Sequence, residues 1–145
     1  MGYSFTTVYE NNPGLYSVDV SVGFYIDGEK CWAELKGIID TGASQTSIDE
    51  EIAKTIGLTS IREEIYHGSG GKQNGHIYKT DLKINKVIYV EPFEIGSIKS
   101  SLKGVDVLIG TDILSRCDMA ITHLNGNTKL TLEYPSKRNL DFTKE

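Results

Sequence analysis

The sequence predicts a mostly β, single-domain fold with two short helices. Apolar and polar residues alternate along residues 18–26, which is the period of a half-buried strand. The pair Asp27-Gly28 follows at once and is a strong hairpin-turn signal. Helical spacing of apolar residues appears in only two short stretches. A chain of this kind closes its sheet or folds it over to bury the apolar faces.

The residues after this turn predict the next strand and the first helix. Alternation continues over about residues 30–39. Apolar residues then recur at near-helical spacing over about residues 48–56. Ser47 and Glu50 have the spacing of a capping box at the start of this helix, and Gly57 is placed to end it.

A glycine-rich stretch occupies the middle of the chain, over residues 66–75. Two apolar segments that favour strands flank it, over residues 61–65 and 77–84. Glycine supplies backbone freedom at little steric cost, so this pattern predicts a hairpin with a flexible glycine-rich tip.

The second half predicts more short strands and one further helix. The strands are expected over residues 86–90, 93–95, 105–109, 120–124 and 129–134. Pro92 lacks a backbone N–H, so it indicates a sheet edge or a bulge. A short helix is expected over residues 111–114, with Thr111 as its cap and Asp112 capping or bracing it. Asn125-Gly126-Asn127 is a hairpin signal between the last two strands.

Length and composition favour one folded domain and exclude several classes of protein. The 145 residues predict a single domain over 1–145, with a core over about 16–134 and a loose polar tail over 135–145. The formal net charge is −5 and no Lys/Arg cluster is present, so no nucleic-acid partner is expected. A hydrophobic content of 39% excludes a mainly disordered chain.

The start of the chain and its apolar runs give no membrane signal. No apolar run approaches the ~18 residues of a membrane span, and no secretory signal is present. Met1-Gly2 with Thr6 fits the loose myristoylation pattern, but no basic patch follows, so a plain N-terminus is favoured. We therefore expect no membrane partner.

The cysteines and histidines indicate neither disulfides nor a metal site. Cys31 and Cys117 are interpreted as free, buried or half-buried thiols in a reducing compartment, which favours a cytoplasmic location. His67, His76 and His123 lack the spacing of a ligand set. No metal or cofactor is expected.

Candidate chemistry lies in the segment from Ile38 to Ser44, where Asp40 ends a buried strand before Thr41-Gly42-Ala43. One isolated carboxylate is a poor hydrolytic catalyst, whereas two carboxylates that share one proton act as acid and base together. An aspartate in this position could also be a structural turn residue that caps the loop. No other aspartate in the chain is followed by Ser or Thr and then Gly.

Residues 38–43 resemble the active-site motif of aspartic proteases. Residues 107–114 resemble the apolar-apolar-Gly element that precedes a short helix in the retropepsin-like (retroviral-type) family. The glycine-rich hairpin lies between them, where that family carries its flap. The resemblance covers about residues 16–132 and implies a retropepsin-like β-barrel with a flap hairpin and two short helices. The sequence resembles cellular or bacterial members of this family more than viral ones.

The resemblance also implies roles for single residues. Asp40 would be the catalytic aspartate, Thr41 would bond to its symmetry mate, and Gly42 would line the cleft. Residues 107–110 would pack beneath the active-site loop. The implied substrate-binding residues are Ala43, Ser44, His67, Gly68, Ser69, Gly70 and Gly71.

A single motif implies that the second carboxylate comes from another copy, in a homodimer with Asp40 of both chains on the axis. The expected function is an aspartic endopeptidase acting on peptide or protein substrates. Ala43 cannot donate a hydrogen bond to the catalytic carboxylate, which predicts a weakly acidic optimum. Two alternatives remain open: a catalytically silent dimerisation or peptide-binding module of this fold, and a protease domain released from a larger polyprotein.

Overall fold

The structure is a computed structural model that describes residues 2–68, 71–99 and 102–144. The strands are β1 Tyr3–Tyr9, β2 Ser17–Ile26, β3 Glu29–Ile39, β4 Ser47–Asp49, β5 Ser60–Gly68, β6 Gly71–Ile84, β7 Ile88–Ile98, β8 Val107–Ile109, β9 Asp118–Thr122 and β10 Thr128–Tyr134. The helices are α1 Glu50–Ile56 and α2 Thr111–Leu114, with short 3-10 turns at Leu124–Gly126 and Phe142–Lys144. The prediction of a mostly β fold with two short α-helices is confirmed.

The main body is a closed barrel. Its sheet has the strand order β2-β3-β8-β4-β7-β6-β5, and a further pairing between β2 and β6 closes six of these strands into a ring. The first hairpin is as predicted: β2 and β3 are antiparallel around Asp27 and Gly28, which both have positive φ. Val20, Val22 and Ile109 are fully buried in the barrel core.

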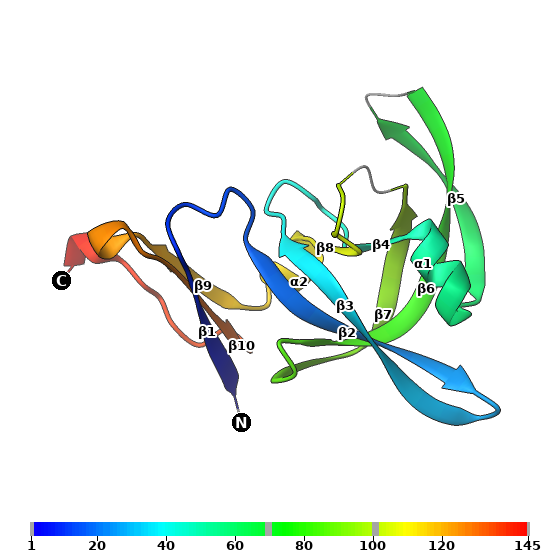
Figure 1. The fold of residues 1–145 in the computed structure, drawn as a ribbon, viewed down its shortest axis with the longest axis horizontal. Helices are drawn as coiled ribbons and strands as arrows, with labels where there is room; N and C mark the ends of the chain where they lie inside the picture. Colours follow the sequence, from blue (N-terminus) through cyan, green and yellow to red (C-terminus); the bar gives the residue numbers. More distant parts are fainter. Residues whose placement is uncertain (1, 69–70, 100–101, 145) are drawn as a thin grey trace.

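The β5–β6 hairpin extends beyond the barrel. Figure 1 shows it projecting from the body, with its tip well clear of the other strands. Its strands are longer than predicted, because backbone pairing continues through the glycine-rich stretch to the pair Gly68 and Gly71. The predicted hairpin is confirmed, but most of the glycine-rich stretch lies in its strands, because strand pairing uses backbone groups that glycine also carries. Ser69 and Gly70 lie outside the described residues.

Both helices begin differently from the prediction. Residues 47–49 form β4, which pairs with β7 and β8, so α1 starts at Glu50 and the predicted capping box is wrong. Asp49 is the N-cap, and its side chain accepts a hydrogen bond from the Glu51 N–H. Gly57 ends the helix in the left-handed conformation, as predicted. Gly110, rather than Thr111, is the N-cap of α2.

Strand β7 runs through Pro92, where two separate strands were predicted. The register between β6 and β7 shifts between Thr80 and Leu82, opposite Phe93 and Val90. Two residues of β7 thus face one residue of β6, so the predicted bulge is confirmed. The bulge lets the strand continue past a residue that cannot donate to its neighbour.

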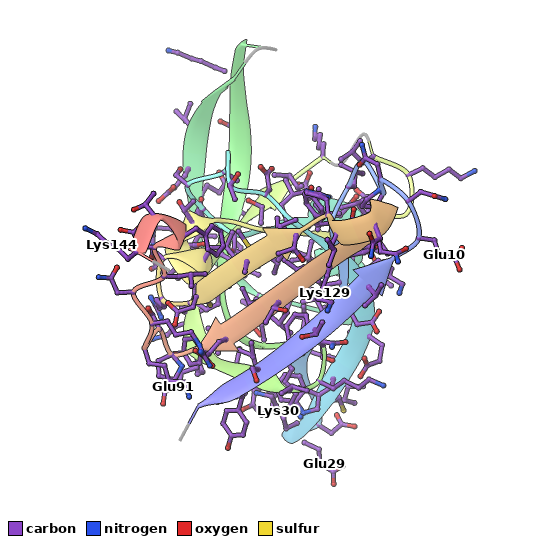
Figure 2. The ribbon with its side chains drawn as sticks, turned by 90° about the vertical axis from the view of Figure 1, so that its left-hand side faces the viewer. Glu10, Glu29, Lys30, Glu91, Lys129 and Lys144 are labelled. Carbon is purple, nitrogen blue, oxygen red and sulfur yellow. The ribbon has the colours of Figure 1, made fainter. Side chains whose placement is uncertain are left out.

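A small second sheet, β1-β10-β9, lies beside the barrel. Figure 2 looks onto its outer face, with Lys129 on the central strand. No strand was predicted before residue 18, yet β1 pairs along its length with β10 and its Phe5 joins the core. The core therefore begins earlier than residue 16.

The C-terminal segment is anchored rather than uniformly loose. The carboxylate of Asp118 accepts hydrogen bonds from the Ser136 hydroxyl and from the backbone N–H groups of Lys137 and Arg138. Both cysteines are free and half-buried, as predicted. Burial raises the pKa of the Cys117 thiol to about 11, and the charge of Asp118 adds to the rise.

Candidate active site

Asp40 stands where β3 leaves the barrel. In the parallel pair of β3 with β8, Ile38 faces Leu108 and Ile39 faces Ile109. The next backbone N–H, that of Asp40, donates to the Ile109 carbonyl at 2.9 Å. The start of the loop is thereby fixed to a buried strand, and the predicted packing of residues 107–110 beneath it is confirmed.

The carboxylate of Asp40 is positioned by a hydrogen bond from its own loop. Its Oδ1 accepts a hydrogen bond of 3.0 Å from the Gly42 N–H, and the Asp40 carbonyl accepts one of 3.2 Å from the Ala43 N–H. Asp40 is half-buried, while Thr41 and Gly42 are exposed. Within the described part of the chain, Gly42 is the one hydrogen-bond donor to this carboxylate. One oxygen is therefore left for other chemistry.

A buried threonine ties the loop to α2. The Thr46 hydroxyl donates to Asp112 Oδ1 at 2.7 Å, and the Thr46 N–H donates to Oδ2 at 2.9 Å. Asp112 Oδ1 also accepts from the Ile113 N–H at 2.9 Å. Asp112 thus braces its helix, as predicted. Thr46 was not anticipated as its partner, because the two residues are 66 positions apart.

Gly110 allows the two segments to meet closely. Its N–H donates to Thr46 Oγ1 at 3.0 Å, and the next N–H, that of Thr111, donates to the Ala43 carbonyl at 2.8 Å. A Cβ atom at position 110 would lie 2.8 Å from the Ala43 carbonyl oxygen and from the Gln45 carbonyl carbon. Those atoms are backbone, so no side-chain rotation could relieve the contact.

A groove of about 460 Å³ extends from this loop along the barrel. The wall of this groove includes Ala43 and Ser44, two of the residues predicted to bind substrate, together with Gly42. Gly71 is not among the described residues of the wall, and the structure does not describe the side chains of His67 to Gly70. The remaining lining residues are Gln45, Ser47, Glu50, Asn74, Gly75, Ser97, Ile98, Lys99 and Leu108.

Most of these remaining lining residues were not predicted from the sequence. Ser47 was interpreted as a helix cap, but it is a buried residue of β4. Ser97 comes from β7, far along the chain, and meets Ser47 and Glu50 only because β4 pairs with β7. Asn74 and Gly75 belong to the base of the β5–β6 hairpin. Their position in the glycine-rich stretch was the one sequence feature that could have indicated that they line the groove.

The described residues contain neither a candidate metal centre nor a candidate membrane-spanning helix. No group of three His, Cys, Asp or Glu side chains in the described ranges is arranged as metal ligands would be. None of the helices in the described part of the chain has the length and apolar character needed to cross a bilayer.

Comparison with known proteins was made on sequence and on structure. A family model described as "gag-polyprotein putative aspartyl protease" matches residues 25–116. DNA damage-inducible protein 1 of Neurospora crassa is 27% identical over 120 residues, covering 79% of this chain and 26% of the relative. The protein of the same name from Kluyveromyces lactis is 28% identical over 102 residues, covering 67% of this chain and 23% of the relative. The chain thus spans about a quarter of the length of these curated relatives.

A solved structure shares the fold. A retropepsin-like aspartic protease from Rickettsia conorii superposes with a TM-score of 0.56 at 16% identity, covering 92% of this chain and 96% of that one. The predicted retropepsin-like barrel is therefore confirmed.

Proposed function

The chain belongs to the gag-polyprotein aspartyl protease family, and we propose that it is an aspartic endopeptidase that works as a homodimer. The observation that carries this is the Asp40 loop beside a peptide-sized groove. Its carboxylate is fixed at a strand end, and one of its oxygens accepts no hydrogen bond from the described residues. The catalytic pair is then Asp40 of one copy and Asp40 of a second copy.

The dimer is proposed because each chain supplies one such carboxylate. A C₂ axis through the loops would bring two equivalent aspartates together. Thr41 and Gly42 are exposed in the single chain, as residues of a shared interface would be. The neighbouring loops also expose apolar side chains, Leu15 at 46% and Leu102 at 45%, and lie along the same side of the barrel in Figure 1. A second copy would cover this surface.

The proposed mechanism uses a water held between the two carboxylates. Like charges about 3 Å apart cannot both ionise, so the pair carries one proton. The ionised Asp40 removes a proton from the water while the protonated one polarises the scissile carbonyl. A gem-diol forms and then breaks down as a proton passes to the leaving amine. No step requires a metal or cofactor.

The other site residues receive supporting roles in this proposal. Thr41 would bond to its counterpart across the axis and hold the loops together. Gly42, Ala43 and Ser44 would contact the substrate backbone. The tip of the β5–β6 hairpin, from His67 to Gly71, would close over a bound peptide as a flap. The free thiols of both cysteines favour a reducing, cytoplasmic setting.

The test is cleavage of a peptide library by the purified protein between pH 4 and pH 7, read by mass spectrometry. Asp40→Asn is expected to lower kcat/KM by a factor of about a thousand or more, because the pair loses its base. Asp27→Asn, in the β2–β3 turn, is the matched control and is expected to cleave normally.

A mixing experiment tests whether both carboxylates act in one site. Wild-type and Asp40→Asn chains are mixed in equal amounts and allowed to exchange subunits. If two Asp40 residues are needed, activity should fall to about a quarter of that of the wild type at the same total concentration, and to about a half if each chain acts alone. A protein that dimerises and binds peptides but cleaves none at any pH would instead be a silent binding module.

A further inference from the structure

One part of the groove wall beyond the Asp40 loop is polar. Ser47 of β4 and Ser97 of β7 line it, with exposed fractions of 8% and 6%. Glu50, the first residue of α1, completes this part of the wall, with 15% of its side chain exposed. We call these three residues the polar wall. Apolar side chains, Ile98 and Leu108, also line the groove, and Leu108 lies opposite Ser47 where β4 pairs with β8.

The carboxylate of Glu50 has two basic neighbours but no hydrogen-bonded partner among the described residues. The nearest basic nitrogen atoms are His76 Nε2 at 3.6 Å and Lys54 Nζ at 3.8 Å, and both distances exceed those of a hydrogen bond. Lys54 is 59% exposed and also lies 3.5 Å from Glu51. Within the described ranges no hydrogen-bond donor reaches the Glu50 carboxylate. A mostly buried carboxylate in that state gains free energy from a cationic hydrogen-bond donor.

The charge of Glu50 acts on its surroundings. Burial raises the pKa of Tyr78, and the negative charge of Glu50 adds to that rise. Figure 1 shows α1 beside β6 at the base of the β5–β6 hairpin, so this charge lies where a peptide held under the hairpin would pass. Lys99 also lines the groove, but it is exposed and its long side chain can turn to solvent. The fixed charge of the wall is therefore negative.

We propose that Glu50 selects substrates that place an arginine or lysine side chain against the polar wall. A guanidinium would bond to the Glu50 carboxylate with two parallel N–H groups, and the hydroxyls of Ser47 and Ser97 would accept further hydrogen bonds. This inference rests on the proposed function, because it assigns the groove to a peptide substrate.

The experiment compares peptides that differ by one charge. Each position within four residues of a cleaved bond carries either arginine or citrulline, which has nearly the same shape without the charge. At one position the wild-type protein is expected to cleave the arginine peptide about tenfold better, judged by kcat/KM. Glu50→Gln is expected to abolish this preference while still cleaving the citrulline peptide.

The matched control is Glu51→Gln. Glu51 is the next residue of α1, is 82% exposed and also lies near Lys54, but it does not line the groove. The Glu51→Gln protein should keep the full arginine preference. The inference is overturned if the wild-type protein shows no preference at any position, or if Glu50→Gln keeps the preference.

Peptide binding by Asp40→Asn separates this inference from the proposed function. Fluorescence anisotropy with labelled arginine and citrulline peptides measures selectivity without cleavage. Tighter binding of the arginine peptide, lost on adding Glu50→Gln, supports the inference even if no cleavage is ever seen. Equal binding of the two peptides, or no binding of either, overturns it.

Discussion

The segments that follow the paired strands β3 and β8 contain similar residues but use their aspartates in different ways. After β3 the order is Asp40-Thr41-Gly42, and after β8 it is Gly110-Thr111-Asp112. Asp112 accepts three hydrogen bonds, two of them from Thr46, with both oxygens engaged. Asp40 accepts one within the described residues, from Gly42, and leaves one oxygen free.

This difference teaches how to separate a structural carboxylate from a candidate catalytic one. A carboxylate whose oxygens are saturated by internal donors contributes to stability and has little capacity left for a substrate. A carboxylate fixed by its backbone but open at its side chain has the opposite properties. Removing Asp112 should therefore affect folding, and removing Asp40 should affect chemistry.

The largest expected effect on stability comes from Asp112→Ala. It leaves the buried N–H and hydroxyl of Thr46 without an acceptor, at a cost of about 3 kcal/mol in the free energy of unfolding. For a chain of this size the melting temperature should fall by about 10 °C. Asp40→Ala should change it by less than about 2 °C, because one exposed loop contact is lost.

Thermal unfolding of both variants at one protein concentration measures this contrast. Asp112→Asn retains one acceptor oxygen and should fall between Asp112→Ala and the wild type. Equal destabilisation by Asp40→Ala and Asp112→Ala would break the comparison between the two segments.

The glycines of the two segments give the next largest effect. A methyl group at Gly110 would meet backbone atoms of Ala43 and Gln45 at 2.8 Å, so Gly110→Ala should destabilise the fold by about 2 kcal/mol. A methyl group at Gly42 would lie 3.3 Å from Asp40 Oδ1, the end of a side chain that can move. Gly42→Ala should therefore reduce cleavage more than it reduces stability.

Urea unfolding and kcat/KM, measured on both glycine variants, test whether Gly110→Ala mainly lowers stability and Gly42→Ala mainly lowers cleavage. If Gly42→Ala loses as much unfolding free energy as Gly110→Ala, the Asp40 loop is as tightly packed as the Asp112 turn. The Asp40 loop would then not be the less constrained of the two segments.

The smallest expected effect concerns pH. Ala43 follows Gly42 and has no side-chain donor, whereas a serine there could donate to the catalytic carboxylate and favour its charged form. Ala43→Ser should move the optimum for cleavage to lower pH by about one unit. Ala120→Ser on β9 adds the same hydroxyl in the other sheet and should leave the profile unchanged. A profile of Ala43→Ser that coincides with the wild type would contradict the donor argument.

Much of the fold could be predicted from local pattern. The hairpin at Asp27-Gly28 and the end of α1 at Gly57 depend on the backbone preferences of a few adjacent residues, and both are confirmed. The start of α1 was missed because Ser47 to Asp49 pair with β7 and β8, and such pairing outweighs a local capping signal. Strand β1 was missed for a similar reason, since its partner β10 lies more than a hundred residues away.

In the candidate site, too, some features follow from the local sequence and others only from the tertiary structure. Asp40, Thr41 and Gly42 form a contiguous motif, so the sequence by itself determined which residues could perform chemistry and that one chain holds one copy of them. Only the tertiary structure decided that Thr46 and Asp112 brace the loop and that Ser47, Glu50 and Ser97 share one wall. The physical reason is that Asp112 lies far along the chain from Thr46, as Ser97 does from Ser47 and Glu50, and the pairing of β4 with β7 and β8 sets which of them meet.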